Sequence, residues 1–590
     1  MLFESAAGYY DRLESLSSRL EMIDVLTLLL KECHKDEIRS MVYMTQGVLS
    51  PPFEGIEIGI AERLAEQAIA RSTGFTEKEI VSDFKRSGDL GVTAEHFASV
   101  TKLRTLLPHK FTIAEVFQIM RKIASTSGQG SQETKIKLLS ELLSTSGPKE
   151  SRYIIRLALG TLRLGVGDAT IIEALSKAFT GERKFKSEIE GAYNICSDLG
   201  EVGSVIADKG EKGILSMRVS LFKPIRPALA ERLPTAEEIM EKMRGRCAVD
   251  MKYDGMRAQL HMDRKKKRIE IYSRNLERIT GMFPDICSAA LEEIKADTVI
   301  LEGEVMAYDE VANTFLPFQE TIQRKRKHGV NEKSIELPVY LFAFDVMYAD
   351  GEDCLSLPYG KRREKLETLV AKDGLVHVTA QITADSPKKL EEYFRLAIDE
   401  GLEGIIAKDL ESRYVAGARK FAWIKLKRSY RGELSDTLDL AIVGYYPGKG
   451  FKAAFKFGGL LCAVYNDKKD VFETIARIGT GFTEKQLEEF RKLLENSKVG
   501  SRPARVVSKV EPDFWVVPKY VITVRADEIT RSPMHTCGAE TLENGDEVGY
   551  ALRFPRIISD GVRTDKAPED ANTTNEIIEM YKMQKKTRLS

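Results

Sequence analysis

The stretch VDMKYDGMR, residues 249–257, places polar residues between apolar ones and then reaches a glycine. Because alternate side chains of a strand share a face, we expect Asp250 and Lys252 to project together. Gly255 allows a tight turn, and Arg257 lies just beyond it. A partly desolvated lysine beside another cation loses its proton more readily than its reference pKa of about 10.4 implies, so Lys252 is a candidate nucleophile. A solvated Lys/Asp hairpin would show the same pattern, and the neighbouring segments decide between these interpretations.

Charged side chains continue in the next two segments. IYSRN carries Arg274, and LEGEV carries Glu302 and Glu304 on one face of a predicted strand. Burying an unpaired carboxylate is costly, so two acids among apolar neighbours need a positive partner. The pair is a candidate ligand set for a divalent cation. A sheet face that is open to water is the alternative.

An aromatic residue and a second group of charges come later in the chain. Phe344 lies near the end of LFAFD, where it can stack on a flat ring or pack in the core, and Glu403 opens EGIIAK beside a glycine. WIKLK alternates strictly, so Lys425 and Lys427 share a face with Trp423. Two ammonium groups on one strand face repel each other, and an anion such as a triphosphate would offset that repulsion. Plain surface exposure of the lysines is the alternative.

The hydrophobic pattern predicts a multidomain protein. A chain of 590 residues suggests three or four domains at roughly 150 residues each. Residues 1–219 show helical periodicity and predict an all-α domain, with one helix expected over 151–164. Residues 220–427 mix strands and helices and predict an α+β domain with much antiparallel sheet. Residues 428–590 carry short strands, including one over 515–524, and a C-terminal helix, which together predict an all-β OB fold.

Composition excludes several classes of protein. Lys plus Arg is 89 and Asp plus Glu is 89, so a uniformly basic coat is excluded while a locally basic groove is not. The seven cysteines are scattered without a CxxC pair, which argues against a zinc ribbon or a disulfide scaffold. The sequence shows no signal peptide and no apolar run of roughly 20 residues, so we expect a cytoplasmic protein.

The ordered segments KYDG, SRN, EGE, FAFD, EGIIAK and WIKLK resemble the six motifs of the nucleotidyltransferase superfamily, which contains DNA ligases, RNA ligases and mRNA capping enzymes. The sequence is most similar to the ATP-dependent DNA ligases of archaea and of eukaryotic replication, and an archaeal source is expected. RLGVGD, residues 163–168, resembles a signature of their helical DNA-binding domain. RFPR, residues 553–556, and RTDK, residues 563–566, resemble the last motif of their OB domain.

The resemblance implies a ligase that seals nicks in duplex DNA during replication, repair and recombination. Lys252 would attack the α-phosphate of ATP and form lysyl-AMP, AMP would pass to the 5′-phosphate at the nick, and the 3′-hydroxyl would then displace it. Each step would use Mg²⁺, with Mn²⁺ as a substitute. An RNA ligase of the same superfamily and a catalytically inactive DNA-binding scaffold are the alternatives.

Further roles follow from the same resemblance, position by position. The implied nucleotide contacts are Asp250, Arg257, Arg274, Glu304, Phe344, Arg419, Lys425 and Lys427. Phe344 would stack on adenine, while Glu304 and Glu403 would bind the metal. Arg553 and Arg556 would orient pyrophosphate as the OB domain closes about a hinge near residues 427–433.

Nicked double-stranded DNA is the expected partner of a monomeric, nucleoid-associated protein. A ligase accepts any sequence, so phosphate contacts should dominate. In RLGVG, Arg163, Gly165 and Gly167 are the candidate DNA contacts, and a plain turn between helices is the alternative. A sliding clamp is a further candidate partner, but residues 99–107 lack the glutamine-led, aromatic-ended peptide by which some archaeal relatives bind it.

Overall fold

The computed structural model describes residues 1–590 except 17, 102–108, 163, 310–313, 316–320, 322–323, 325–336, 372–373, 401, 428–436, 449–456, 496, 542–544, 560 and 587–590. The described chain divides into two compact units. The first unit contains residues 1–231, 254–380 and 408–423. The second unit contains residues 232–253, 381–407 and 424–590.

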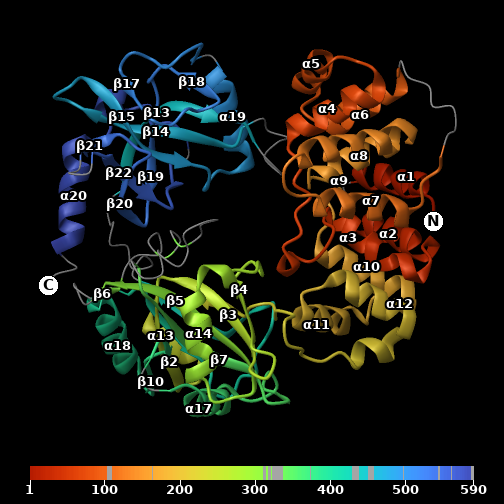
Figure 1. Ribbon diagram of the computed structural model, residues 1–590. Helices are drawn as coiled ribbons and strands as arrows, with labels where there is room; N and C mark the ends of the chain where they lie inside the picture. Colours follow the sequence, from red (N-terminus) through yellow and green to blue (C-terminus); the bar gives the residue numbers. More distant parts are fainter. Residues whose placement is uncertain are drawn as a thin grey trace. The chain divides into compact units, whose positions relative to one another are not determined.

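The first unit begins with a helical region, which extends from red to yellow in Figure 1. Its α-helices are α1 Phe3–Glu14, α2 Arg19–Glu32, α3 Ile38–Gln46, α4 Glu62–Thr73, α5 Glu77–Ser87, α6 Leu90–Ser99, α7 Ile113–Ser125, α8 Ser131–Thr145, α9 Pro148–Ala158, α10 Asp168–Thr180, α11 Lys186–Cys196 and α12 Leu199–Leu215. The helical prediction for this part of the chain is therefore confirmed.

Local sequence sets where these helices begin and end. Thr112 caps α7 in a capping box with Glu115, whose carboxylate accepts from the Thr112 backbone N–H at 2.7 Å. The helix predicted over 151–164 is wrong at its end, because α9 stops at Ala158. Gly160 follows with a φ of +65°, a left-handed conformation that ends a helix and favours glycine.

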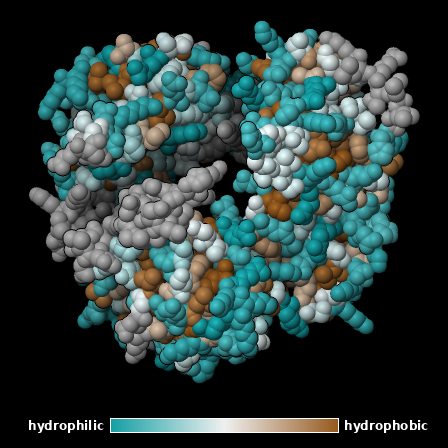
Figure 2. Space-filling model, viewed as in Figure 1, coloured by the Kyte–Doolittle hydropathy of each residue, from teal (hydrophilic) through white to brown (hydrophobic). Residues whose placement is uncertain are grey.

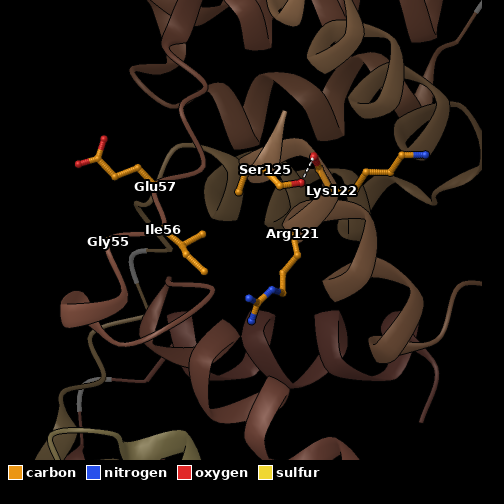
Figure 3. A pocket seen from close by; sticks show the side chains of 7 residues that line it. Gly55, Ile56, Glu57, Arg121, Lys122 and Ser125 are labelled. Atoms are coloured by element: carbon orange, nitrogen blue, oxygen red, sulfur yellow. Dashed lines mark hydrogen bonds between the residues drawn. The ribbon is translucent and has the colours of Figure 1, made fainter. Parts of the chain in front are cut away.

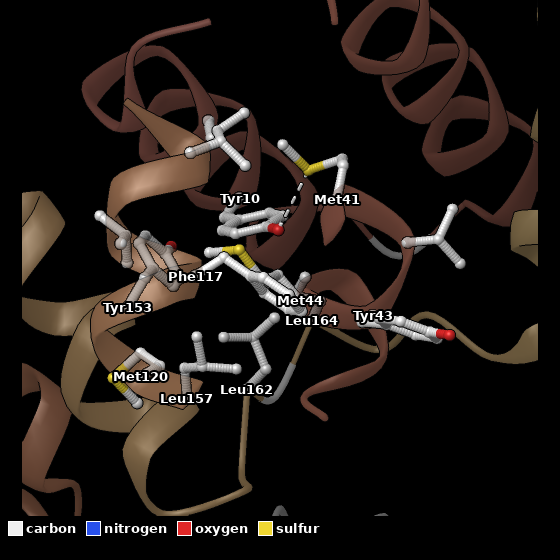
Figure 4. Close-up of a cluster of buried hydrophobic side chains, with 14 of the residues drawn as sticks. Tyr10, Met41, Tyr43, Met44, Phe117, Met120, Tyr153, Leu157, Leu162 and Leu164 are labelled. Atoms are coloured by element: carbon white, nitrogen blue, oxygen red, sulfur yellow. Dashed lines mark hydrogen bonds between the residues drawn. The ribbon is translucent and has the colours of Figure 1, made fainter. Parts of the chain in front are cut away.

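The apolar faces of these helices enclose one core, part of which is drawn in Figure 4. Tyr10 and Tyr153 meet edge to face with ring centroids 5.4 Å apart, and the Tyr10 hydroxyl donates to Met41 Sδ at 3.4 Å. Arg156 is buried beside this core and donates to Glu14 at 2.7 Å and to Asp89 at 2.9 Å. Burial of an ion pair is tolerated there because both partners are hydrogen-bonded.

A second part of the first unit is an antiparallel sheet in the order β4-β3-β5-β7-β8, with β6 paired to β5 and β9 parallel to β7. Its strands are β3 Met256–Asp263, β4 Arg268–Ser273, β5 Thr298–Asp309, β6 Thr314–Phe315, β7 Val339–Ala349, β8 Glu352–Asp353 and β9 Val376–Val378. Helices α14 Pro284–Glu293 and α17 Tyr359–Leu369 contact the sheet. The predicted antiparallel α+β organisation is confirmed here.

The second unit carries another sheet, in the order β1-β12-β11-β2-β10. The strands are β1 Leu229–Arg232, β2 Cys247–Lys252, β10 Gln381–Ala384, β11 Gly404–Lys408 and β12 Arg419–Lys427, of which β1, β11 and β12 continue into segments of the first unit. Helices α13 Ala236–Lys242 and α18 Pro387–Asp399 contact each other. In the register, Gln381 of β10 lies opposite Asp250 of β2.

The C-terminal part of the second unit is rich in strands. They are β13 Leu438–Tyr446, β14 Gly459–Asn466, β15 Val471–Ile478, β16 Lys498–Val499, β17 Val506–Val507, β18 Phe514–Val516, β19 Val521–Arg525, β20 Glu528–Ser532, β21 Cys537–Thr541, β22 Glu547–Arg553 and β23 Arg556–Ile557. Helices α19 Glu484–Glu495 and α20 Thr574–Lys586 accompany them. The single strand predicted over 515–524 is wrong, since Pro518, which lacks an N–H, separates β18 from β19.

The surface agrees with the high charged fraction of the sequence. Figure 2 shows hydrophilic residues over most of the coloured face, with hydrophobic residues scattered among them. Within the described ranges, every helix is too short or too polar to span a bilayer.

Candidate active site

Lys252 is the last residue of β2, and its side chain is 20% exposed. Its ammonium group donates to Oε2 of Glu403, the residue just before β11. The backbone strengthens this arrangement, because the Glu403 N–H donates to the Lys252 carbonyl at 3.0 Å. Strand pairing thus brings together two residues that lie 151 positions apart in the sequence.

Glu403 also contacts a second lysine. Lys427, the last residue of β12, pairs with Glu403 Oε1, whereas Lys252 pairs with Oε2. We call these three residues the lysine cluster. Two ammonium groups are tolerated near each other because a carboxylate lies between them. Both lysines thus contact an anionic oxygen, the kind of partner that a phosphate group also offers.

This geometry refines the expectation for Lys252. We expected a neighbouring cation to favour the neutral amine, and Lys252 contacts a carboxylate as well. A nucleophilic role for Lys252 would require its ammonium group to lose a proton and to leave Glu403.

The other predicted residues of this sheet have different surroundings. Asp250 is buried, and its Oδ1 accepts from Gln381 Nε2 at 2.5 Å, so its side chain is anchored within the sheet. Lys425 is half-buried between Ile424 and Leu426, which are fully buried. The alternation predicted for WIKLK is confirmed for these residues, and full surface exposure of Lys425 is excluded.

In the first unit, Arg257 of β3 pairs with the buried Glu302 of β5. Arg257 Nε donates to Glu302 Oε1 at 2.8 Å. Burial raises the pKa of Glu302, and the charge of Arg257 opposes that change. Burial lowers the pKa of Arg257, but the Glu302 carboxylate more than offsets this and leaves it above the ordinary value. The acid therefore has the positive partner that its burial requires.

Glu302 and Glu304, the candidate metal-ligand pair, have different surroundings. Glu302 is engaged by Arg257, whereas Glu304, opposite Arg257 in the β3–β5 register, is half-exposed. Across the described part of the chain, three or more His, Cys, Asp or Glu side chains are nowhere grouped to hold a metal ion. A cation site on this strand face stays a prediction, and within it Glu302 is already paired with Arg257.

Phe344 of β7 belongs to a group of aromatic rings around a buried lysine. Its ring meets Trp423 edge to face at 5.8 Å. Lys408 Nζ donates to the Phe344 carbonyl at 3.1 Å and lies 4.8 Å from the Phe344 ring centroid and 4.5 Å from that of Trp423. Phe344 itself is half-buried, so packing in the core does not account for its whole surface. The pattern of the sequence gave no signal for Lys408.

The remaining predicted residues are placed as follows. Arg274 is exposed in the turn after β4. Arg553 pairs with Glu528 at 2.7 Å, and Arg556 pairs with Asp527 at 3.4 Å. Arg419 begins β12, but its side chain is outside the described residues.

The predicted DNA contacts lie in the helical region. Gly165 has a φ of +69°, and Gly167 immediately precedes α10 with an extended backbone. Arg163 lies outside the described residues. The predicted hinge is also outside them beyond Lys427.

An open cavity of about 540 Å³ lies elsewhere in the helical region (Figure 3). Gly55 and Ile56 line it from one side, and Arg121 and Lys122 of α7 from the other. None of the predicted nucleotide contacts lines this cavity. The reactive groups are therefore identified by the side-chain contacts of Lys252 and Arg257 and not by cavity volume.

Three segments of the chain match known families. Residues 2–176 match "DNA ligase N terminus", residues 227–427 match "ATP dependent DNA ligase domain", and residues 453–566 match "ATP dependent DNA ligase C terminal region". The chain is 44% identical over 589 residues to the "Probable DNA ligase" of Dictyoglomus thermophilum, covering 100% of this chain and 99% of that protein. It is 42% identical to the "DNA ligase" of Sulfolobus acidocaldarius, covering 100% of this chain and 99% of that protein.

A solved structure titled "Pmar-Lig_PreS3" has a similar fold, with a TM-score of 0.56 and 16% identity, covering 94% of this chain and 98% of that one. Together, the lysine cluster, the sheets and the sequence matches define a nucleotidyltransferase. The chain belongs to the ATP-dependent DNA ligase family. It is an enzyme with a helical N-terminal region, an adenylation domain and a strand-rich C-terminal domain; the RNA-ligase alternative is not favoured.

Proposed function

We propose that Lys252 is the nucleophile that carries AMP during nick sealing. The observation that supports this most directly is the lysine cluster, in which Lys252 and Lys427 share the single carboxylate of Glu403. When the α-phosphate of ATP enters, Lys427 gains an anionic partner. Lys252 gives up a proton to water, its neutral amine attacks phosphorus, the bond to pyrophosphate breaks, and AMP is held for transfer to the 5′-phosphate of a nick.

The nucleotide contacts are proposed from the motifs together with their surroundings. Phe344 stacks on adenine with the part of its ring that the core does not cover. Arg257 donates to the ribose or phosphates from a guanidinium already fixed by Glu302. The remaining proposed contacts are Asp250, Arg274, Glu304, Arg419, Lys425 and Lys427.

Magnesium fits this site as a companion of the nucleotide. Glu304 is half-buried and Glu403 is 26% exposed, so each carboxylate keeps accessible surface, whereas Glu302 is buried and paired with Arg257. The ion would neutralise negative charge on the phosphates during transfer. Two carboxylates with phosphate oxygens and water are a typical set of ligands for Mg²⁺.

For the rest of the chain we propose a helical DNA-binding domain over 1–219, an adenylation domain over 220–427 and an OB-fold domain over 428–590. Arg553 and Arg556 would exchange Glu528 and Asp527 for pyrophosphate. Gly165 and Gly167 would let the backbone approach the phosphates of nicked duplex DNA, beside Arg163. We further propose a monomer in the cytoplasm near the nucleoid, and we leave a sliding clamp as a candidate partner.

Incubation with α-labelled ATP and Mg²⁺ tests the nucleophile. Label should remain on the denatured protein and should be absent from Lys252→Ala, because no other amine replaces the attacking group. Lys361→Ala is the matched control, since Lys361 is 66% exposed in a surface pair with Glu364, and it should be labelled normally. Label that survives Lys252→Ala would reject the proposal.

A further inference from the structure

Tyr414 closes a ring of hydrogen bonds around the Arg257–Glu302 pair. Its hydroxyl donates to Glu302 Oε2 at 2.7 Å and accepts from the Ala228 N–H at 2.9 Å. Arg257 completes the ring, because Nε donates to Glu302 Oε1 at 2.8 Å and Nη1 donates to the Ala228 carbonyl at 2.9 Å. Four segments that are distant in sequence are thereby joined through side-chain and backbone groups.

The ring is buried, so each of its hydrogen bonds carries weight. Glu302 is 1% exposed and Tyr414 is 6% exposed. Burial raises the pKa of Tyr414 well above its ordinary value, so the phenol remains a donor to Glu302 at neutral pH. A buried donor or acceptor that loses its partner cannot turn to water instead.

The surroundings hold Tyr414 itself in one orientation. Its backbone N–H donates to the Leu355 carbonyl at 3.0 Å, and its ring meets Trp423 edge to face at 5.8 Å. On another side, Arg362 lies 5.7 Å from the ring centroid and is fixed by the fully buried Asp345. Tyr414 is therefore a rigid support and not a side chain that swings into a reaction.

This ring of hydrogen bonds fixes the orientation of the Arg257 guanidinium. Its Nε and Nη1 donate to Glu302 and to the Ala228 carbonyl, and the Tyr414 hydroxyl is hydrogen-bonded both to Glu302 and to the N–H of the same Ala228. Removing that oxygen leaves Glu302 and the segment at Ala228 free to shift, and the guanidinium follows them. A planar group that reads phosphate or ribose tolerates little misalignment.

We propose that Tyr414 is a positioning residue for adenylation, which acts by fixing Glu302 and Ala228 and, through them, the orientation of Arg257 toward the nucleotide. The inference rests on the proposed role of Arg257 as a nucleotide contact and extends it to a residue outside the six motifs. Tyr414 does not touch the nucleotide in this account.

The test compares steady-state nick sealing by the full chain with that by Tyr414→Phe over a range of ATP concentrations. We expect the KM for ATP to rise about tenfold with a smaller change in kcat, because a ground-state contact is loosened. Tyr43→Phe is the matched control, since it removes an equally short buried bond, from Tyr43 to Asp198 at 2.7 Å in the helical region. Its KM should stay unchanged, even if its thermal stability falls as much as that of Tyr414→Phe.

A double-mutant comparison separates positioning from general structural support. Adding Tyr414→Phe to Arg257→Lys should change KM little further if Tyr414 acts through Arg257. If Tyr414→Phe folds poorly, Glu302→Gln disturbs the same ring of hydrogen bonds from another residue and should also raise the KM for ATP. The inference would be overturned if the KM for ATP were unchanged in Tyr414→Phe. It would also be overturned if the KM of the double variant rose by the product of the two single effects. Label that survives Lys252→Ala would instead defeat the proposed function, so the two failures are distinguishable.

Discussion

In the helical region, Arg156 is paired with two acids, whereas in the second unit one acid, Glu403, is paired with two lysines. Arg156 is 4% exposed and donates to both Glu14 and Asp89. The members of the lysine cluster are 20–26% exposed. The first arrangement surrounds a buried cation with acids and stabilises the fold, while the second holds two cations at a partly accessible place. Accessibility thus distinguishes a structural cluster from one that can accept an anion.

The largest effect is expected from Arg156→Met. Removing the guanidinium takes away the partner shared by the buried carboxylate of Asp89 and the more exposed carboxylate of Glu14. The free energy of unfolding should fall by about 3–5 kcal/mol, as is typical when one partner of a buried ion pair is lost. Urea denaturation measures it. An unchanged unfolding midpoint would mean that this cluster does not support the fold.

Glu403→Gln tests the other side of the comparison. The amide cannot neutralise Lys252 and Lys427, and it is a poor ligand for a cation that accompanies ATP. The rate of self-adenylation should fall by roughly a hundredfold, as on loss of one charge-stabilising group in other active sites, while stability changes little. Glu367→Gln, in an exposed pair with Arg363 at 2.6 Å, is the matched control. A Glu403→Gln rate near that of the control would remove Glu403 from the chemistry.

Sequence patterns anticipated some of this and missed other parts for physical reasons. Alternation placed Lys252 at the end of a strand, and the helical periodicity of the N-terminal region was correct. Alternation cannot reveal which segment pairs with which, so the contact of Lys252 with Glu403 was not foreseen. Alternation also shows which face of a strand a side chain occupies but not how deeply that side chain is buried. The buried Glu302 and the half-buried Glu304 therefore looked alike in the sequence.

Other features left no signal at all. Tyr414 lies in a loop without periodicity, and its role becomes visible only through its hydrogen bonds to Glu302 and Ala228. Residues that end helices and strands were visible in the sequence, but the predictions gave them too little weight. Gly160 ended a helix that apolar spacing would have continued, and Pro518 interrupted a predicted strand. Tertiary contacts that join distant segments decide such cases.

Acid pH should have a smaller effect on the free energy of unfolding, which acts through the contact of Glu14 with Arg156 in the helical region. Burial alone would raise the pKa of Glu14, but the hydrogen bonds and charge of Arg156 outweigh it and hold this pKa below its ordinary value of 4.5. The stability that Glu14 contributes is complete above that value and is lost as the pH falls through the folded-state pKa. Unfolding free energies measured at falling pH below 4.5 should therefore decline less in Arg156→Met than in the unmodified protein. Parallel curves would disprove the coupling.

The smallest effect is expected from an exposed ion pair in the same helical region. Arg71 is 49% exposed and pairs with Glu133 at 2.7 Å. Arg71→Met should change the free energy of unfolding by less than about 1 kcal/mol, because water screens the pair. It uses the same substitution as Arg156→Met, so an equal loss in both variants would show that burial does not distinguish these clusters.

Nick sealing as proposed depends on one amine, Lys252, to carry the adenylate. Peptide mapping by mass spectrometry after incubation with ATP and Mg²⁺ tests it most directly, because it reads the position of the bond itself. We predict a single adenylate on the peptide that contains Lys252, in a phosphoramide that forms on no other lysine. An adenylate found on Lys427 or Lys425, with Lys252 unmodified, would contradict the account.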